Sequence, residues 1–256
     1  MAGIRKILPG SNPVSGNALF IAALLILSVF YQYHKTLFYP PQSIHAWRQS
    51  DCASLALNYS KEGMKFFSPQ IHLLASDNGT SGYAATSEVP LLYYITAALY
   101  KLFGPREFLI RLLNLLIFLS GLYYLFRLFR IILEDYFWSF SLAILLFTSP
   151  LLIYYGNNYL TNAPAFALGI IGFYHFFRFH REGRTASFVL SAVFYFLAGC
   201  FKITGLFLFF AILAYLMLEW AGLLPGNRQK APVCGRKPLR VTQVRSGASR
   251  AFNQSS

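Results

Sequence analysis

The residues best suited to chemistry lie in one polar stretch, residues 45–91, which follows the first apolar segment. Five of the nine Asp and Glu residues of the chain fall in it or just beyond it: Asp51, Glu62, Asp77, Glu88 and Glu107. The apolar segments that follow carry almost no acids. Because carboxylates serve enzymes as general acids and bases, any proton transfer by this protein is expected in this interval.

Two of these acids stand at the starts of predicted helices. Asp51 closes the run WRQSD, and Glu88 lies two residues before Pro90, a residue type that suits the first turn of a helix. If both acids face one cleft, Asp51 could take a proton from a hydroxyl while Glu88 orients an acceptor or holds a divalent ion. The competing interpretation is that both are ordinary capping acids, stabilised by the helix dipole.

Three cations are candidates for binding a phosphate group. Arg48 lies close enough to pair with Asp51 or with a phosphate. Lys202 falls in a turn predicted on the external side, where the positive-inside rule gives no reason for a lysine. Arg111 lies a turn inside its helix, so a purely solvated role is not expected for it. The alternative for such residues, and the favoured one for Arg106, is snorkelling at a helix end.

The sequence assigns no metal ligand. His45 and His72 lie in the same stretch as Asp51, but their spacing is not that of a metal site. The cofactor is therefore unknown, with a divalent cation left open. The three cysteines are scattered without a C-x-x-C pair, which favours neither a disulfide framework nor a zinc site.

The composition indicates a membrane protein. Hydrophobic residues make up 56% of the chain and charged residues only 12%, whereas a soluble domain is about a quarter charged. The net charge of +13 could suggest a nucleic-acid partner. Because the basic residues flank apolar segments, the positive-inside rule explains them better, and no nucleic-acid partner is predicted.

The apolar pattern predicts an all-α, polytopic membrane helix bundle with a cytoplasmic N-terminus. About six spans are expected, at residues 17–33, 109–129, 137–154, 161–177, 187–201 and 205–220. The first external loop, 34–107, carries two more predicted helices, 51–65 and 89–103. Two arginine clusters follow this helix: Arg127 with Arg130, and Arg178 with Arg181 and Arg184. If 89–103 also crossed, both clusters would lie outside, so a re-entrant or surface-lying helix is predicted there.

Helix 51–65 is predicted to be amphipathic and to lie on the membrane surface. Its expected N-cap is Ser50 and its expected C-cap is Gly63. The external turn at 155–164 (YGNNYLTNAP) is either a plain connector or part of the lining of the same cleft.

The domain boundary is predicted near Pro225. Residues 1–225 form the membrane region, and residues 226–256 are expected to be a basic, disordered cytoplasmic tail. The abrupt change in composition at this point motivates the hypothesis that the chain is a truncated or frame-shifted product.

The stretch from Asn17 to Trp220 resembles the N-terminal half of a GT-C glycosyltransferase. The branch is the one that uses polyprenyl-phosphate sugars: protein O-mannosyltransferases, aminoarabinose transferases and their bacterial relatives. The resemblance is carried by Asp51 in the first external loop, the EVPLLYY helix start at Glu88, the FGPREF run leading to Arg111 and the FKITG turn at Lys202. Many relatives have a second acid beside the first-loop acid, and this chain does not.

The resemblance implies a multi-pass glycosyltransferase of the cell envelope, in the plasma (inner) membrane. Such an enzyme moves a sugar from a polyprenyl-phosphate donor to a hydroxyl of a lipid, glycan or protein acceptor at the external face. It implies Asp51 as the base and Glu88 as the residue that orients the acceptor or an ion. The phosphate ligands would come from three cations: Arg48, Arg111 and Lys202.

The sequence favours this function over two other classes, a transporter or flippase and a non-catalytic membrane scaffold. A transporter or flippase coupled to ions generally needs ionisable residues deep within its spans, and no predicted span carries Asp or Glu at its middle. A non-catalytic membrane scaffold is disfavoured by the cluster of acids in one external loop.

Overall fold

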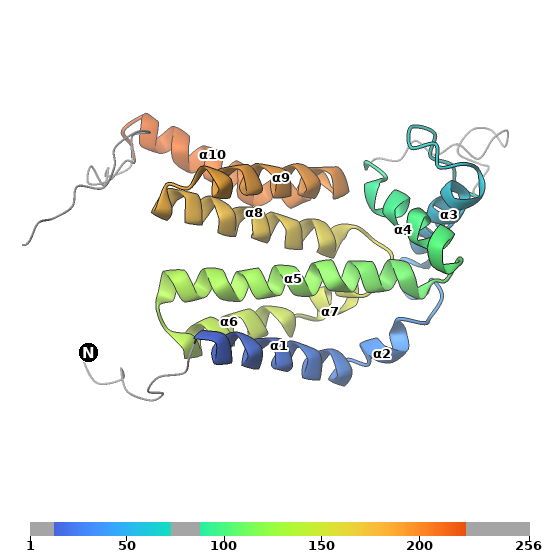
Figure 1. Cartoon of the computed structure of the whole chain (residues 1–256), viewed down its shortest axis with the longest axis horizontal. Coiled ribbons are helices and arrows are strands. Elements are labelled where there is room, and N and C mark those ends of the chain that lie inside the picture. Colours follow the sequence, from blue (N-terminus) through green and yellow to red (C-terminus); the bar gives the residue numbers. More distant parts are fainter. Residues whose placement is uncertain (1–12, 73–87, 224–256) are drawn as a thin grey trace, which may run out of the picture.

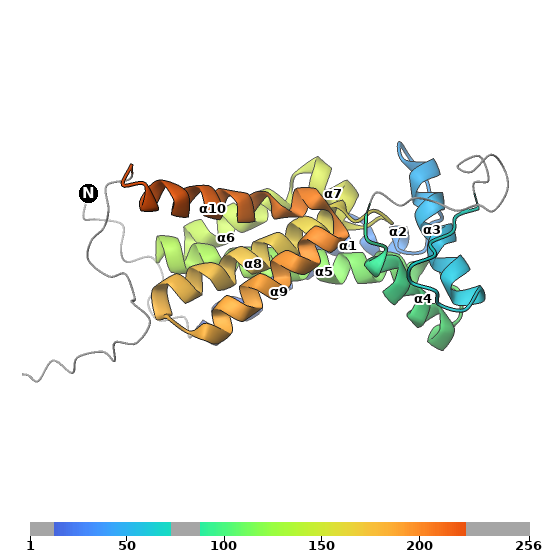
Figure 2. The same ribbon diagram turned by 90° about the horizontal axis from the view of Figure 1, so that it is seen from above.

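The structure is a computed structural model that describes residues 13–72 and 88–223. This part of the chain is 77% helical and contains no strand, so the prediction of an all-α protein is confirmed. Six longer helices run alongside one another as a bundle (Figures 1 and 2): α1 (Pro13–Phe30), α5 (Phe108–Leu133), α6 (Tyr136–Phe147), α8 (Asn162–Glu182), α9 (Thr185–Phe201) and α10 (Phe207–Trp220).

Two helices gather at one end of this bundle (Figure 1) and are called the head below: α3 (Ala46–Lys61) and α4 (Leu91–Phe103). The short helix α2 (Tyr33–Thr36) leads from α1 toward the head. Helix α4 packs against α3 and does not run through the bundle. That residues 89–103 do not cross the membrane stays a prediction.

The helices have the character of membrane spans. By length and apolarity, Phe108–Leu133 and Ile203–Trp220 could each cross a membrane, and the bent pair Tyr136–Phe147 and Pro150–Gly156 could form a third span. The apolar helices Gly16–Phe30 and Thr185–Phe201 are shorter. A polytopic membrane bundle is thus the architecture of the protein, while the count of six spans stays a prediction.

One predicted span differs in shape from the expectation. Residues 137–154 were predicted as one span, but the chain bends by 70° between α6 and α7 (Pro150–Gly156). Ser149 is extended, with φ −61° and ψ 123°, and Pro150 opens the next helix. A proline disfavours the helical conformation in the residue before it and suits the first turn of a new helix, which accounts for the bend.

Helices α5 and α8 are in close contact where Gly121 faces Ala167. A Cβ atom added to Gly121 of α5 would lie 2.4 Å from Cβ of Ala167 on α8, so only glycine fits there without a shift. Helix α8 also packs along α9. These contacts fix α5, α8 and α9 relative to one another.

Helix α3 begins earlier than predicted. Its N-cap is His45, and Ser50 lies inside the helix. The side chain of Gln49, 1% exposed, donates to the Gln42 carbonyl at 2.8 Å and to Tyr154 Oη at 3.2 Å. These contacts hold the residues before Asp51 in the helix. They could not be predicted from a capping pattern in the sequence, which is why the helix start was placed too late.

The other end and the two faces of α3 are close to the prediction. Gly63, with φ +98°, directly follows the C-cap Glu62 and supplies the left-handed conformation that ends the helix. The predicted apolar face is buried, but it packs on α4. Part of the predicted polar face is buried too, because Asn58 Nδ2 donates to the Gln70 carbonyl at 2.8 Å and Ser54 Oγ accepts from His72 N.

The predicted tail, residues 226–256, lies outside the described residues, as do the first twelve residues and Asp77. The hypothesis of a truncated product stays a prediction.

Candidate active site

Glu88 lies at the centre of a polar cluster where the head meets the bundle. Its Oε1 is 3.0 Å from Arg48 Nη2 of α3 and 3.3 Å from Lys202 Nζ at the end of α9. Its Oε2 accepts a hydrogen bond of 2.7 Å from Thr161 Oγ1 at the start of α8. The Glu88 side chain is 14% exposed. One carboxylate therefore ties together four segments that are distant in the sequence.

The position of Lys202 follows from the turn that carries it. Lys202 ends α9, and the 3₁₀ turn Ile203–Leu206 leads into α10. A Cβ atom added to Gly205 would lie 2.9 Å from the Ala165 carbonyl oxygen, so the turn sits directly on α8. Lys202 Nζ then reaches Asn162 Oδ1 at 2.8 Å as well as Glu88.

The two cations keep hydrogen-bonding capacity for a further anion. A guanidinium carries five N–H donors and an ammonium carries three. The contacts with Glu88, together with Asn162 for Lys202, use only part of this capacity. The Arg48 side chain is 41% exposed, so it is open to an incoming group. The cluster is suited to binding a phosphate beside Glu88.

Asp51 lies one turn beyond Arg48 on α3 and is half-buried. Burial raises the pKa of its carboxyl group above the ordinary value, and the positive charge of Arg48 partly offsets this by lowering the pKa. No hydrogen bond to its carboxylate is seen within the described part of the chain. A carboxylate with a raised pKa and no fixed partner can act as a proton acceptor.

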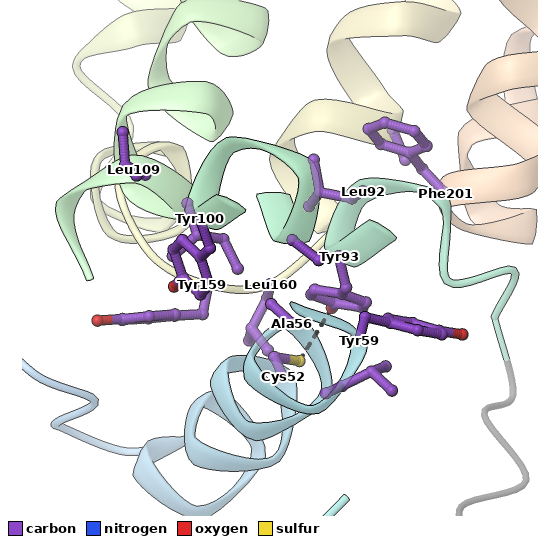
Figure 3. Close-up of a cluster of buried hydrophobic side chains, with 14 of the residues drawn as sticks. Cys52, Ala56, Tyr59, Leu92, Tyr93, Tyr100, Leu109, Tyr159, Leu160 and Phe201 are labelled. Atoms are coloured by element: carbon purple, nitrogen blue, oxygen red, sulfur yellow. Dashed lines mark hydrogen bonds between the residues drawn. The ribbon is translucent and has the colours of Figure 1, made fainter. Parts of the chain in front are cut away.

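The neighbouring thiol shows that Asp51 and Glu88 lie in the same region. The charges of Arg48, Glu88 and Asp51 all act on Cys52, whose pKa burial raises to about 11. Cys52 Sγ and Tyr93 Oη of α4 are 2.9 Å apart and hydrogen bonded (Figure 3). Burial also raises the pKa of Tyr93. This neutral pair joins α3 to α4.

Arg111 lies apart from the cluster, inside the protein. It is 3% exposed, and its Nε, Nη1 and Nη2 donate to the carbonyls of Tyr39 at 3.1 Å, Asn157 at 2.7 Å and Pro40 at 3.1 Å. Its guanidinium also lies 4.6 Å from the centre of the Tyr159 ring. With each nitrogen bonded to the backbone, Arg111 is not placed to receive a phosphate, and we leave it out of the site.

The turn at 155–164 is buried and supplies residues to the cluster around Glu88. Asn114 Nδ2, one turn along α5 from Arg111, donates to the Asn158 and Leu160 carbonyls at 2.7 Å and 3.2 Å. Asn158 and Thr161 are both 2% exposed, so the turn is part of the interior. It delivers Thr161 to Glu88 and Asn162 to Lys202. The sequence signal was the run of polar residues directly before a helix start.

His45 and His72 are each already paired with another side chain. His45 Nε2 is 3.0 Å from Tyr155 Oη, and His72 Nε2 is 2.8 Å from Asn58 Oδ1. Within residues 13–72 and 88–223, His, Cys, Asp and Glu form no group of three or more that could hold a metal ion. The residues that would hold the divalent ion left open above are therefore not identified.

An apolar groove of about 510 Å³ lies between α4 and α5, beside the head. Leucine and phenylalanine side chains of both helices line it, among them Leu99, Phe103, Leu112 and Leu116, and Arg106 is also in its lining. A groove of this kind suits a hydrocarbon chain with an anionic group near one end.

The sequence of residues 87–226 matches a family model described as dolichyl-phosphate-mannose-protein mannosyltransferase. The match takes in more than half of the 256 residues and includes Glu88, Arg111, Thr161 and Lys202. Arg48 and Asp51 lie before it. No curated protein and no solved structure matches the chain significantly.

Proposed function

Because the chain belongs to the dolichyl-phosphate-mannose-protein mannosyltransferase family, we propose that it transfers a sugar from a polyprenyl-phosphate donor to an acceptor hydroxyl, with Asp51 as the general base. Membership makes it a membrane glycosyltransferase that uses a lipid-linked donor. The observation that supports our choice of site is the cluster of Arg48, Glu88 and Lys202 beside Asp51.

In the proposed reaction, the acceptor oxygen attacks the anomeric carbon of the donor sugar. The bond between that carbon and the phosphate oxygen breaks, and the polyprenyl phosphate leaves with the bonding electrons. Asp51 takes the proton of the attacking hydroxyl. Arg48 and Lys202 stabilise the charge that develops on the leaving phosphate. The other residues of the site bind and orient the substrates.

Glu88 has a different part in this proposal from the one predicted for it. Its oxygens bond to Arg48, Lys202 and Thr161. A carboxylate so engaged is better suited to fixing the two cations than to holding an acceptor or an ion. We therefore assign Glu88 as a positioning residue that sets the distance between Arg48 and Lys202.

The donor lipid is proposed to lie in the groove between α4 and α5. The groove is apolar, and one of its walls is α4, the helix of the head that follows Glu88 and packs against α3, which carries Arg48. A prenyl chain placed there would remain in the membrane while its phosphate reached the polar side. The proposal places this end of the molecule on the external face of the plasma membrane, with a lipid, glycan or protein acceptor approaching from solvent.

The reaction class is tested with purified full-length chain in detergent or lipid nanodiscs. The chain is given a labelled polyprenyl-phosphate sugar or, separately, a nucleotide sugar, each with a panel of hydroxyl acceptors. Labelled product is expected from the lipid-linked donor alone. Transfer from the nucleotide sugar at an equal rate would reject the donor class.

The phosphate role of Lys202 is tested by Lys202→Met. Removing one cation from the leaving phosphate is expected to lower the transfer rate by about 10²-fold. Lys101→Met, which removes an exposed lysine from α4, is the matched control and should retain nearly full activity. Product formation is measured over a range of donor concentrations. Equal rates for the two variants would exclude Lys202 from the phosphate site.

A further inference from the structure

A polar pocket lies at the opposite end of the bundle from the head. Its volume is about 230 Å³, and it is enclosed by α1, α5 and the start of α6. Its polar lining includes Asn17, Arg127, Arg130 and Tyr136. The Tyr136 hydroxyl donates to the Gly16 carbonyl at 3.1 Å, which fixes the start of α6 against α1 and closes one wall.

The two arginines of this pocket are held by aromatic rings. The Arg127 guanidinium lies 5.4 Å from the centre of the Tyr174 ring and 5.9 Å from that of Tyr123. The Arg130 guanidinium lies 5.2 Å from the centre of the Tyr136 ring. Ring contacts of this kind orient a guanidinium but leave its N–H groups free to bond an anion.

No acid neutralises this pair within the described part of the chain. Arg127 and Arg130 are three residues apart on one helix, so their charges repel each other. At the same end, Arg178 and Arg184 both pair with Glu182, at 2.7 Å and 3.3 Å. The chain carries no acid before Asp51, so the residues that precede α1 cannot supply a carboxylate either.

The nearest acids in the sequence do not fill this role. Glu134 and Asp135 follow α5 directly, and the Asp135 carboxylate accepts a hydrogen bond of 2.9 Å from the Trp138 backbone N–H. Neither acid forms an ion pair with Arg127 or Arg130 in the part of the chain described here. The pocket thus presents two positive groups and an amide without a protein anion.

The side chains beside the pocket indicate that the missing anion belongs to a lipid. Phe137 and Trp138, which follow Tyr136, are 64% and 59% exposed, and Leu19 of α1 is 58% exposed. Exposed aromatic residues beside cations are typical of the level of lipid headgroups. Basic pockets between spanning helices are known to bind phosphorylated headgroups.

We propose that Arg127 and Arg130 bind the phosphate of an anionic phospholipid in the pocket between α1, α5 and α6. Its acyl chains would lie along the exposed apolar surface of α1 and α6. The bound lipid offsets the repulsion between the two arginines and joins α1 to the rest of the bundle. This site is separate from the proposed donor site, which lies at the other end of the molecule.

The test uses the full chain in a neutral detergent, with phosphatidylglycerol, phosphatidylcholine or inorganic phosphate added separately. Bound lipid is counted by native mass spectrometry. Phosphatidylglycerol is expected to bind about tenfold more tightly to the unchanged chain than to the double variant Arg127→Gln and Arg130→Gln. Arg184→Gln removes an exposed cation from the same end and should bind the lipid as the unchanged chain does.

A third variant tests the site independently, in case the double variant folds poorly. Asn17→Trp keeps both arginines and fills the pocket, so it should weaken binding of phosphatidylglycerol by a similar factor. Equal binding by all variants, or an equal loss in Arg184→Gln, would overturn the site. If inorganic phosphate is retained only when the two arginines are present, while phosphatidylglycerol binds no more tightly than phosphatidylcholine, the ligand is free phosphate and the lipid assignment is wrong.

Discussion

Replacing Asp51 with asparagine is expected to lower the rate of sugar transfer by about 10²- to 10⁴-fold. Asparagine keeps the size and polarity of the side chain but cannot accept the proton of the attacking hydroxyl. Because no hydrogen bond to the Asp51 carboxylate is seen in the described structure, the change should leave the head folded. The measurement is the steady-state rate of product formation by purified wild type and variant, with thermal unfolding as a check on folding.

Glu62→Gln provides the matched control. Glu62 is an exposed acid at the end of the same helix, so this variant removes an equal charge from α3 without touching the cluster. It should transfer sugar at close to the wild-type rate. If Asp51→Asn were as active as Glu62→Gln, Asp51 could not be the base.

Replacing Arg111 with methionine is expected to cause the largest loss of stability. Three backbone carbonyls would lose their donor: that of Asn157 in a buried hydrogen bond, and those of Tyr39 and Pro40 in part-buried ones. Arg111 itself is only 3% exposed. A buried carbonyl left unpaired costs about 1–3 kcal/mol and a part-buried one costs less, so a total of roughly 2–5 kcal/mol is expected. The midpoint of thermal unfolding should fall by about 10 °C.

Two further variants show whether the bonds of Arg111 cause this effect. Arg106→Met removes an exposed arginine five residues earlier and should change the unfolding midpoint little. Arg111→Lys keeps the charge but lacks the planar array of donors, so it should recover only part of the loss. An unfolding midpoint for Arg111→Met equal to that of Arg106→Met would contradict the structural role given to Arg111.

The helices of the bundle could be predicted from the sequence because each one is determined by the residues of its own segment. Apolar segments near the length of a membrane span, separated by polar turns, determine helix positions without reference to the rest of the chain. The end of α3 at Gly63 could be predicted for the same reason, since a glycine with positive φ ends a helix by its own conformation. The bend before Pro150 also has a local signal, the proline itself, but apolarity alone predicted a single span there.

The partners within the site could not be predicted, because they are distant in the sequence. Glu88 meets Arg48 across 40 residues and Thr161 across 73 residues. Spacing alone therefore gave Glu88 a role toward substrate, whereas its partners point to positioning. Arg111 had the same difficulty, since an arginine near a helix start could face either lipid phosphate or buried carbonyls. The partners of Arg111, the carbonyls of Tyr39, Pro40 and Asn157, are 72, 71 and 46 residues away in the sequence, so spacing could not identify them.

The pH dependence of transfer in wild type and Arg48→Gln tests the role of Asp51 most directly. Burial raises the pKa of Asp51 and Arg48 lowers it. Activity should therefore fall with decreasing pH as Asp51 becomes protonated, beginning at a higher pH than for an ordinary aspartate. In Arg48→Gln this fall should move to still higher pH, and the residual activity of Asp51→Asn should lack it. An acid limb at the same pH in wild type and Arg48→Gln, or one that persists in Asp51→Asn, would show that another group takes the proton.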